Sequence, residues 1–244
     1  MIFKRTLSIL IIVLLWESLA IVTDPIYFVS LPEAFLSLIE AFKQDSLLTD
    51  ILASLRRVSL ALLAVFIIAI PLGVSIGSSK KINLSTEPIT RFLRYIPAPT
   101  IIPLSVIWFG TGELSKIFIV FWGVFFPVLL GIRDAAKATP KEYIECAQSL
   151  NYSEFKIMKD VIFENIKPDT LNLLRIAFAE SWIYLLMAEM IASPNGIGKA
   201  LILAQRYLRV DKIFGILILL AIIGLVSELL FQILRKLLFR YKND

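Results

Sequence analysis

The stretch VSLALLAVFIIAIPLGVSI, residues 58–76, contains no charged side chain and is long enough to cross a lipid bilayer as a helix. Similar apolar stretches recur along the 244-residue chain, in which 58% of the residues are hydrophobic and only 18% are charged. Soluble domains are less apolar than this. The composition therefore predicts an all-α integral membrane protein with a single transmembrane domain, residues 1–244.

About six spans are predicted when the reading is extended in both directions from residues 58–76. The other five are residues 6–22, 89–109, 114–132, 170–191 and 214–234. Lys4 and Arg5 ahead of the first stretch can also be read as the start of a cleaved signal peptide, but Glu17 and the lack of a small-residue cleavage site favour a retained helix. Residues 27–50 mix apolar and charged side chains, which is typical of short helices at the membrane surface.

The third stretch, residues 89–109, contains Pro97, Pro99 and Pro103. Each proline removes a backbone hydrogen-bond donor, so this span must be kinked or partly unwound where protein covers the freed groups. A helix of this kind is typical of one that lines a cavity. We therefore expect the three prolines to line a cavity or pathway within the protein.

The distribution of basic residues predicts the orientation of the chain. Lys80 and Lys81 follow the second span directly, and most of the 25 lysines and arginines fall on one side if six spans are counted with both termini inside. Both ends of this multi-pass protein are therefore expected in the cytoplasm. The segment 199–212 is a basic segment on the outer side, either a solvated loop or an attraction for an anionic ligand or a docked partner.

Several functions are disfavoured by what the chain lacks. There is no histidine, and the single Cys146 excludes an intrachain disulfide, so the commonest general base and metal ligand are missing. A phosphate-binding loop of the form G-x-x-x-x-G-K-[ST] is also missing. We expect no catalytic residue, no metal site, no cofactor bound by this chain and no nucleic-acid partner, because basic cytoplasmic loops beside anionic lipid explain the net charge of +5.

The longest polar stretch, residues 134–168, is predicted to be a cytoplasmic helical hairpin. Thr139, Pro140 and Glu142 form the pattern of a capping box with proline at the first helical position. Asn151 tolerates the left-handed conformation that ends a helix and can cap the next one. An apolar stripe follows at helical spacing, formed by Phe155, Met158, Val161 and Ile162, which either packs on the chain's own helix ends or is covered by a partner.

This hairpin resembles the EAA loop of ABC importer permeases. The resemblance rests on Glu145-Cys146-Ala147, on Asn151 after three intervening residues, and on Val161-Ile162-Phe163. The chain departs from the family pattern where Cys146 replaces an alanine, where Asn151 replaces a glycine, and where Phe163-Glu164 replaces Leu-Pro.

The likeness extends to most of the chain. The segments SLRRV (54–58), WFGTGE (108–113), AEM (188–190) and GIG (196–198) resemble the nitrate, sulfonate and taurine branch of these permeases. The resemblance implies the fold of type I ABC importer permeases. It also implies a binding-protein-dependent importer whose cargo is a small anion such as nitrate, a sulfonate, taurine or bicarbonate.

The resemblance further implies how such a protein works. Two permease copies, expected to form a homodimer, assemble with two separate ATPase subunits that bind ATP and Mg²⁺, and an external solute-binding protein delivers the cargo. The hairpin is then a coupling element that docks on the ATPase. The residues expected to take part are Glu142, Glu145, Cys146, Ala147, Asn151, Phe155, Met158 and Val161.

Two acidic residues are candidates for the translocation pathway, because a charge inside a span is costly unless it faces a cavity or a partner. Nine residues separate Glu180 from Glu189, and at about 100° per residue they lie on opposite helix faces. We expect Glu180 to face the pathway, with an ion pair to Arg175 as the alternative, and Glu189 to anchor the loop 193–198. Trp182 is a further candidate for lining the route, although aromatic residues in spans also serve in packing.

Two other functions remain open from the residues alone. An ATP-independent secondary transporter or channel can use Glu180 as its ion or proton site. An intramembrane enzyme is a weaker reading, because no serine–lysine or paired-aspartate arrangement is evident.

Overall fold

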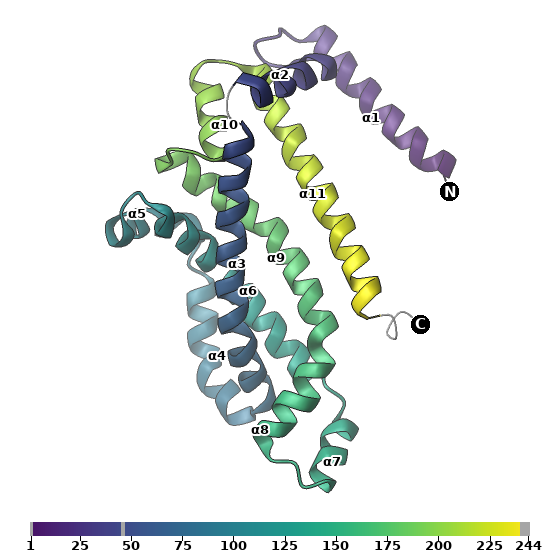
Figure 1. Cartoon of the computed structure of the whole chain (residues 1–244), viewed down its shortest axis with the longest axis vertical. Helices are drawn as coiled ribbons and strands as arrows, with labels where there is room; N and C mark the ends of the chain where they lie inside the picture. The colour runs from purple at the N-terminus through teal and green to yellow at the C-terminus, as the bar shows by residue number, and fades with distance from the viewer. Residues whose placement is uncertain (1, 45–46, 240–244) are drawn as a thin grey trace. The chain divides into compact units, whose positions relative to one another are not determined.

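The computed structural model describes residues 2–44 and 47–239, with side chains from residue 10 onward except at 44 and 192. The chain is 87% helical, and no strand occurs in the described ranges. Four described helical segments are long and apolar enough to cross a membrane: α3 (Leu47–Ser78), α6 (Glu113–Lys137), the continuous segment Glu154–Ile191, and α11 (Val210–Leu238). Figure 1 shows these helices in the whole chain. The all-helical membrane class predicted from composition is confirmed.

The chain divides into two compact units, each described here by itself. The first contains the chain up to Ser54 and Glu189–Leu225, and so holds α1 (Ile2–Val22), α2 (Leu31–Gln44), α10 (Ile197–Arg206) and the first part of α11. Helix α2 buries Ala34, Leu38 and Ala41 at helical spacing and leaves its other face exposed. Ser37 donates a hydrogen bond to the carbonyl of Asp211 at 2.7 Å, which fixes α2 against the start of α11.

The second unit contains Leu55–Ala188 together with the end of α11. It holds most of α3, then α4 (Lys80–Arg94), α5 (Ala98–Phe109), α6, α7 (Lys141–Ser149), α8 (Glu154–Ile157), the π-helical segment η1 (Met158–Ile162) and α9 (Phe163–Ala192). Helices α3 and α6 approach closely at Gly77, where an added Cβ would lie 2.5 Å from the carbonyl oxygen of Arg133. Only glycine permits this backbone contact.

The predicted third span, residues 89–109, is two helices in the structure. Helices α4 and α5 meet at a bend of 88°, either as a broken span or as a re-entrant loop. Pro97 precedes α5 as its N-cap, Pro99 lies in the first turn, and Pro103 lies inside the helix. Proline disfavours helical geometry in the residue before it, so the chain leaves α4 ahead of Pro97.

The predicted hairpin also needs correction. Its second helix is not separate from the span expected at 170–191, because α8, η1 and α9 form one helical segment from Glu154 to Ile191. The polar region between α6 and α8 is therefore shorter than the predicted loop 134–168. The remaining helices lie where spans were expected but extend further: α1 covers Ile2–Val22, α3 starts at Leu47, and α11 covers Val210–Leu238.

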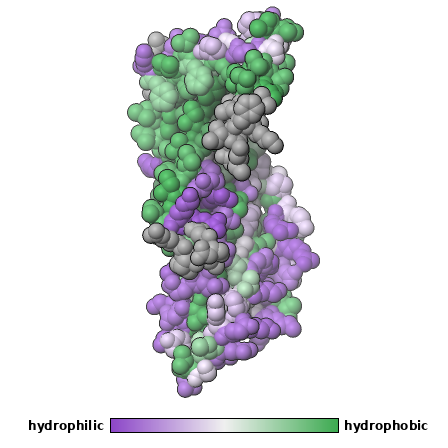
Figure 2. All heavy atoms as spheres, turned by 90° about the vertical axis from the view of Figure 1, so that its right-hand side faces the viewer, coloured by the Kyte–Doolittle hydropathy of each residue, from purple (hydrophilic) through white to green (hydrophobic). Residues whose placement is uncertain are grey.

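The surface matches a protein whose surroundings are partly lipid. Figure 2 shows a face with a broad area of hydrophobic residues in green and a mostly hydrophilic lower end in purple. That lower end is where Figure 1 draws α7 and α8. Large apolar side chains such as Leu63, Ile67 and Leu225 are 58%, 63% and 66% exposed, an arrangement that would be costly in water and is normal in a bilayer.

Candidate functional site

Helix α7 and the turn after it form a compact projection built by local backbone bonds. Asn151 has φ of 58°, in the left-handed region that ends helices. Its N–H donates to the carbonyl of Gln148 at 2.9 Å, and the N–H of Tyr152 donates to the carbonyl of Ala147 at 3.1 Å. These two bonds form a Schellman motif. The turn predicted at Asn151 therefore occurs there, with a hydrogen-bond pattern that holds the end of α7 in one conformation.

The start of α7 differs from the predicted capping box. Pro140 is the N-cap and makes no side-chain bond to the helix. The hydroxyl of Thr139 is buried and instead accepts a hydrogen bond from the side chain of Asn165 at 3.3 Å. The threonine thus ties the start of α7 to α9, so the capping-box prediction was wrong because a tertiary contact used its hydroxyl.

The predicted apolar stripe is divided between core and surface. Ile162 is buried and Met158 and Val161 are half-buried, whereas Phe155 is 72% exposed. The stripe does not stay on one face because η1 is a π-helical turn, which has a different angular spacing from an α-helix. Packing back onto the chain itself therefore accounts for part of the stripe and leaves Phe155 uncovered.

The projection presents further exposed side chains around Phe155. Tyr143 is 55% exposed and Leu150 is 63% exposed, while Glu142, Glu145 and Cys146 are also at the surface. Ala147 of α7 is buried. Tyr143 and Leu150 were missed by the sequence reasoning, although their size and position in a polar segment were visible signals. We call the six exposed residues Glu142, Tyr143, Glu145, Cys146, Leu150 and Phe155 the α7 surface.

Glu180 lies half-buried on α9 in the second unit. The alternative that it pairs with Arg175 is not seen, because Arg175 pairs with Glu228 at 2.8 Å. Within the described chain Glu180 forms no hydrogen bond or ion pair. One turn further along α9, Tyr184 packs its ring over Gly123 of α6, where any larger residue would clash with it.

Tyr184 also borders a small cavity of about 120 Å³. Pro97, Trp122 and Phe126 line the same cavity, so one of the three predicted prolines faces an internal space. Trp182 does not line this cavity: it is only 8% exposed, and its indole N–H has no hydrogen-bond partner among the described residues. Of the predicted pathway residues, the structure thus brings Pro97 to a cavity and places Trp182 in the helix packing.

Glu189 belongs to a different environment, in the first unit. Its side chain is 1% exposed, and its two carboxyl oxygens accept bonds from the hydroxyl of Ser54 at 2.8 and 2.9 Å. One of them also accepts from the backbone N–H of Gly198 at 2.9 Å. These contacts hold the turn that leads into α10, and they leave no carboxyl oxygen directed to an open surface.

The same turn is held by two residues of α3. Asp50 accepts from the N–H of Gly196 at 2.6 Å, and Ser54 accepts from the N–H of Ile197 at 3.0 Å. Gly196 has φ of 119°, which a side chain would strain. The first backbone donors of α10 are therefore satisfied by three side chains, and we call Asp50, Ser54 and Glu189 the α10 anchor.

A second polar contact joins two of the sequence motifs. Arg57 is fully buried, and its guanidinium donates to both carboxyl oxygens of Glu113 at 3.0 and 2.5 Å. Lys116 is also buried and donates to the carbonyls of Thr111 and Gly112 at 2.6 and 3.0 Å. The turn between α5 and α6 is thus fixed by two basic residues. This pairing was not predicted, although SLRRV and WFGTGE were both noted.

Comparison with known proteins identifies the family. Residues 69–241 match the binding-protein-dependent transport system inner membrane component family. The taurine transport system permease protein TauC of Escherichia coli K12 is 32% identical over 205 residues, covering 84% of this chain and 74% of TauC. A putative ABC transporter permease of Methanocaldococcus jannaschii is 33% identical over 222 residues, covering 88% and 83%.

Two further matches agree with this. The nitrate import permease NrtB of Synechocystis is 30% identical over 179 residues, covering 73% of this chain and 65% of NrtB. An inward-facing structure of the MetNI methionine ABC transporter shares the fold, with a TM-score of 0.67 at 17% identity, covering 78% of this chain and 94% of that one. The chain therefore belongs to the binding-protein-dependent transport system inner membrane component family and is a permease subunit of an ABC importer.

Proposed function

We propose that this permease carries a small anion across the cell membrane and is driven by a separate ATPase subunit that docks on the α7 surface. The assembly contains two copies of this chain, two ATPase subunits that bind ATP and Mg²⁺, and an external solute-binding protein. Both termini lie on the cytoplasmic side with α7; Met1 and residues 240–244 are outside the described structure.

The exposure of the α7 surface is the observation that carries the proposal. Phe155, Leu150 and Tyr143 are large apolar or aromatic residues that are exposed in a polar segment beside the exposed carboxyl groups of Glu142 and Glu145. Side chains of this kind, surrounded by charged residues, are typical of protein interfaces. The Schellman motif supports the same reading, because a rigid projection transmits a movement of its partner better than a loose loop.

Replacing Glu145 by arginine tests the docking site. The arginine places the wrong charge in the surface that meets the ATPase, and like-charge contacts cost several kcal/mol in an interface. We expect Glu145→Arg to abolish co-purification of the ATPase while the permease still inserts in the membrane. Asp169→Arg is the matched control, because Asp169 is an exposed acidic residue of α9 outside the α7 surface. Unchanged ATPase binding by Glu145→Arg would remove α7 from the docking site.

The relatives support the class of cargo. TauC is named for taurine, NrtB for nitrate, and a Bacillus subtilis permease that is 27% identical over 191 residues for aliphatic sulfonates. These solutes share a compact oxyanion group, which leads us to a small anion. The solute-binding protein would select among them, because it receives the solute first.

Glu180 is our candidate for the pathway. A half-buried carboxyl group with no hydrogen bond or ion pair among the described residues requires a water-filled cavity or a second subunit, since lipid would not accommodate its charge. We expect Glu180→Gln to change the rate of solute uptake at least several-fold while assembly with the ATPase is retained. An unaltered uptake rate would exclude Glu180 from the pathway.

Solute uptake by vesicles into which the purified protein is reconstituted distinguishes an importer from a secondary transporter. The importer requires ATP, an ATPase subunit and a solute-binding protein together, whereas a secondary transporter needs only this chain and an ion gradient. Solute uptake by vesicles containing the chain alone would therefore overturn the proposal.

A further inference from the structure

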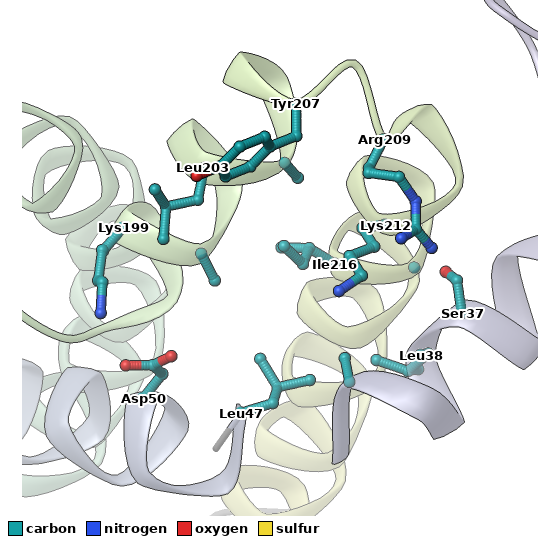
Figure 3. Close-up of a pocket in the computed structure, with 14 residues that line it drawn as sticks. Ser37, Leu38, Leu47, Asp50, Lys199, Leu203, Tyr207, Arg209, Lys212 and Ile216 are labelled. Atoms are coloured by element: carbon teal, nitrogen blue, oxygen red, sulfur yellow. The ribbon is translucent and has the colours of Figure 1, made fainter. Parts of the chain in front are cut away.

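The first unit contains a cavity of about 590 Å³, and none of the residues proposed for the pathway or for ATPase docking lines it. It lies between α2, the first turn of α3, α10 and the first turns of α11 (Figure 3). Its walls are largely apolar, and they include Leu38, Leu47, Leu203 and Ile216. The cavity is large for an anion of the size of nitrate, and such an anion gains nothing from apolar walls.

Basic side chains border this apolar space. Among the described lining residues, Lys199, Arg209 and Lys212 stand against one carboxyl group, that of Asp50, and Arg209 also pairs with the neighbouring Asp211 at 2.6 Å. Asp50 accepts a hydrogen bond from the N–H of Gly196 and thus belongs to the α10 anchor. Figure 3 shows Lys199 on α10 and Lys212 on α11 on opposite sides of the space, with leucine and isoleucine side chains between them. The lining therefore carries an excess of positive charge around an apolar interior.

Part of the cavity is expected near the boundary of the bilayer, because the span predicted at 214–234 begins among its lining residues. Two of its walls are the first turns of α3 and α11, and both helices are long and apolar enough to span a membrane. Positions at the start of a span lie near the boundary between head groups and hydrocarbon. Trp16, Phe28 and Phe214 form an aromatic cluster in the same unit, with ring centroids 4.9–5.2 Å apart, and aromatic residues are enriched at this boundary.

We infer that this cavity is a binding site for an anionic membrane lipid. The phosphate group lies near Lys212 on one side of the space, Lys199 adds positive charge from the other side, and an acyl chain occupies the space among Leu47, Leu203 and Ile216. A basic pocket between helices with an apolar interior has the chemistry of such a ligand. The α10 anchor serves this site by holding α10, and with it Lys199, in place.

Lipid retention by the purified full-length protein tests the inference. The protein, in the assembly in which it is isolated, is exchanged into nanodiscs of phosphatidylglycerol or phosphatidylcholine with identical acyl chains, and bound lipid is measured by native mass spectrometry. We expect phosphatidylglycerol to be retained about twenty-five-fold more tightly. Each lysine near an anionic lipid contributes about five-fold in affinity, so Lys199→Gln with Lys212→Gln should abolish the preference. Equal retention of both lipids by the unmodified protein would overturn the inference.

A control pair separates the site from general surface charge. Lys43→Gln with Arg206→Gln removes the same charge from exposed positions of α2 and α10 that do not line the cavity. This pair should keep the preference for phosphatidylglycerol, and loss of the preference in both pairs would show an effect of charge alone and overturn the site.

Two further measurements fix the occupant. Ala200→Trp fills the cavity from α10 and should remove lipid retention with all basic residues present; retention at the unmodified level would place the lipid elsewhere and overturn the site.

Glycerol 3-phosphate offers the same anionic group without an acyl chain and should compete weakly. If glycerol 3-phosphate displaced phosphatidylglycerol as effectively as free lipid does, the ligand would not be a lipid. Crosslinking of Lys199 to the solute-binding protein in place of lipid would equally overturn the choice of a lipid.

Discussion

Glu145 and Glu189 are both glutamates of sequence motifs, and the structure uses them in opposite ways. Glu145 is exposed on α7, where the described chain gives it no hydrogen bond. Glu189 is 1% exposed and accepts hydrogen bonds from Ser54 and Gly198. The first is available to a partner and the second is fully used within its own unit. A carboxyl group in a motif therefore marks either a docking site or an internal anchor, and its burial and partners distinguish the two.

The largest effect is expected at Glu189. Glu189→Leu leaves the hydroxyl of Ser54 and the N–H of Gly198 buried without their acceptor, and removing one side of such a buried network costs about 3–5 kcal/mol. We expect a lower midpoint of thermal unfolding in detergent and faster hydrogen exchange of the backbone amides of residues 196–200. Glu189→Gln retains one oxygen acceptor and should lose less. Unchanged stability in both variants would contradict the anchor role.

Phe155 should have the next largest effect, on binding and not on folding. The side chain is 72% exposed, so its truncation leaves no cavity in the chain itself. If it is a buried contact in the complex, Phe155→Ala should weaken ATPase binding about thirty-fold, or about 2 kcal/mol. Titration of the ATPase onto reconstituted permease measures this. Ile107→Ala is the control, because Ile107 is 76% exposed on α5, and an equal loss in both variants would argue against a specific contact.

Asn151 should show the smallest effect. Asn151→Val places a β-branched residue at φ of 58°, which costs about 1–2 kcal/mol locally and loosens the Schellman motif. Asn151→Gly suits the same φ and should behave like the unmodified chain. We expect Asn151→Val to lower the number of solute molecules moved per ATP hydrolysed, with normal ATPase binding. The same transport stoichiometry in the valine and glycine variants would show that rigidity of the turn does not matter for coupling.

The local features of this chain could be predicted from its sequence. The bend between α4 and α5 occurs at Pro97 and the turn at Asn151, because each depends on the backbone preferences of a few adjacent residues. The membrane class follows from composition in the same way, since apolar stretches of this length are stable as helices in the hydrocarbon of a lipid bilayer. Even so, the capping box failed: the hydroxyl of Thr139 bonds to Asn165, 26 positions further along the chain.

The candidate site also has local features that could be predicted and long-range contacts that could not. The sequence alone determined that the polar segment between the fourth and fifth predicted spans contains a helix that ends at Asn151, because polarity and helix-ending residues act over short distances. Only the tertiary structure decided that Glu189 meets Ser54, 135 positions away, and that Arg57 meets Glu113, 56 positions away. Helix packing brings these groups together, and the cost of burying a polar group without a partner then selects the pairs. The spacing of residues within one helix carries no information about either choice.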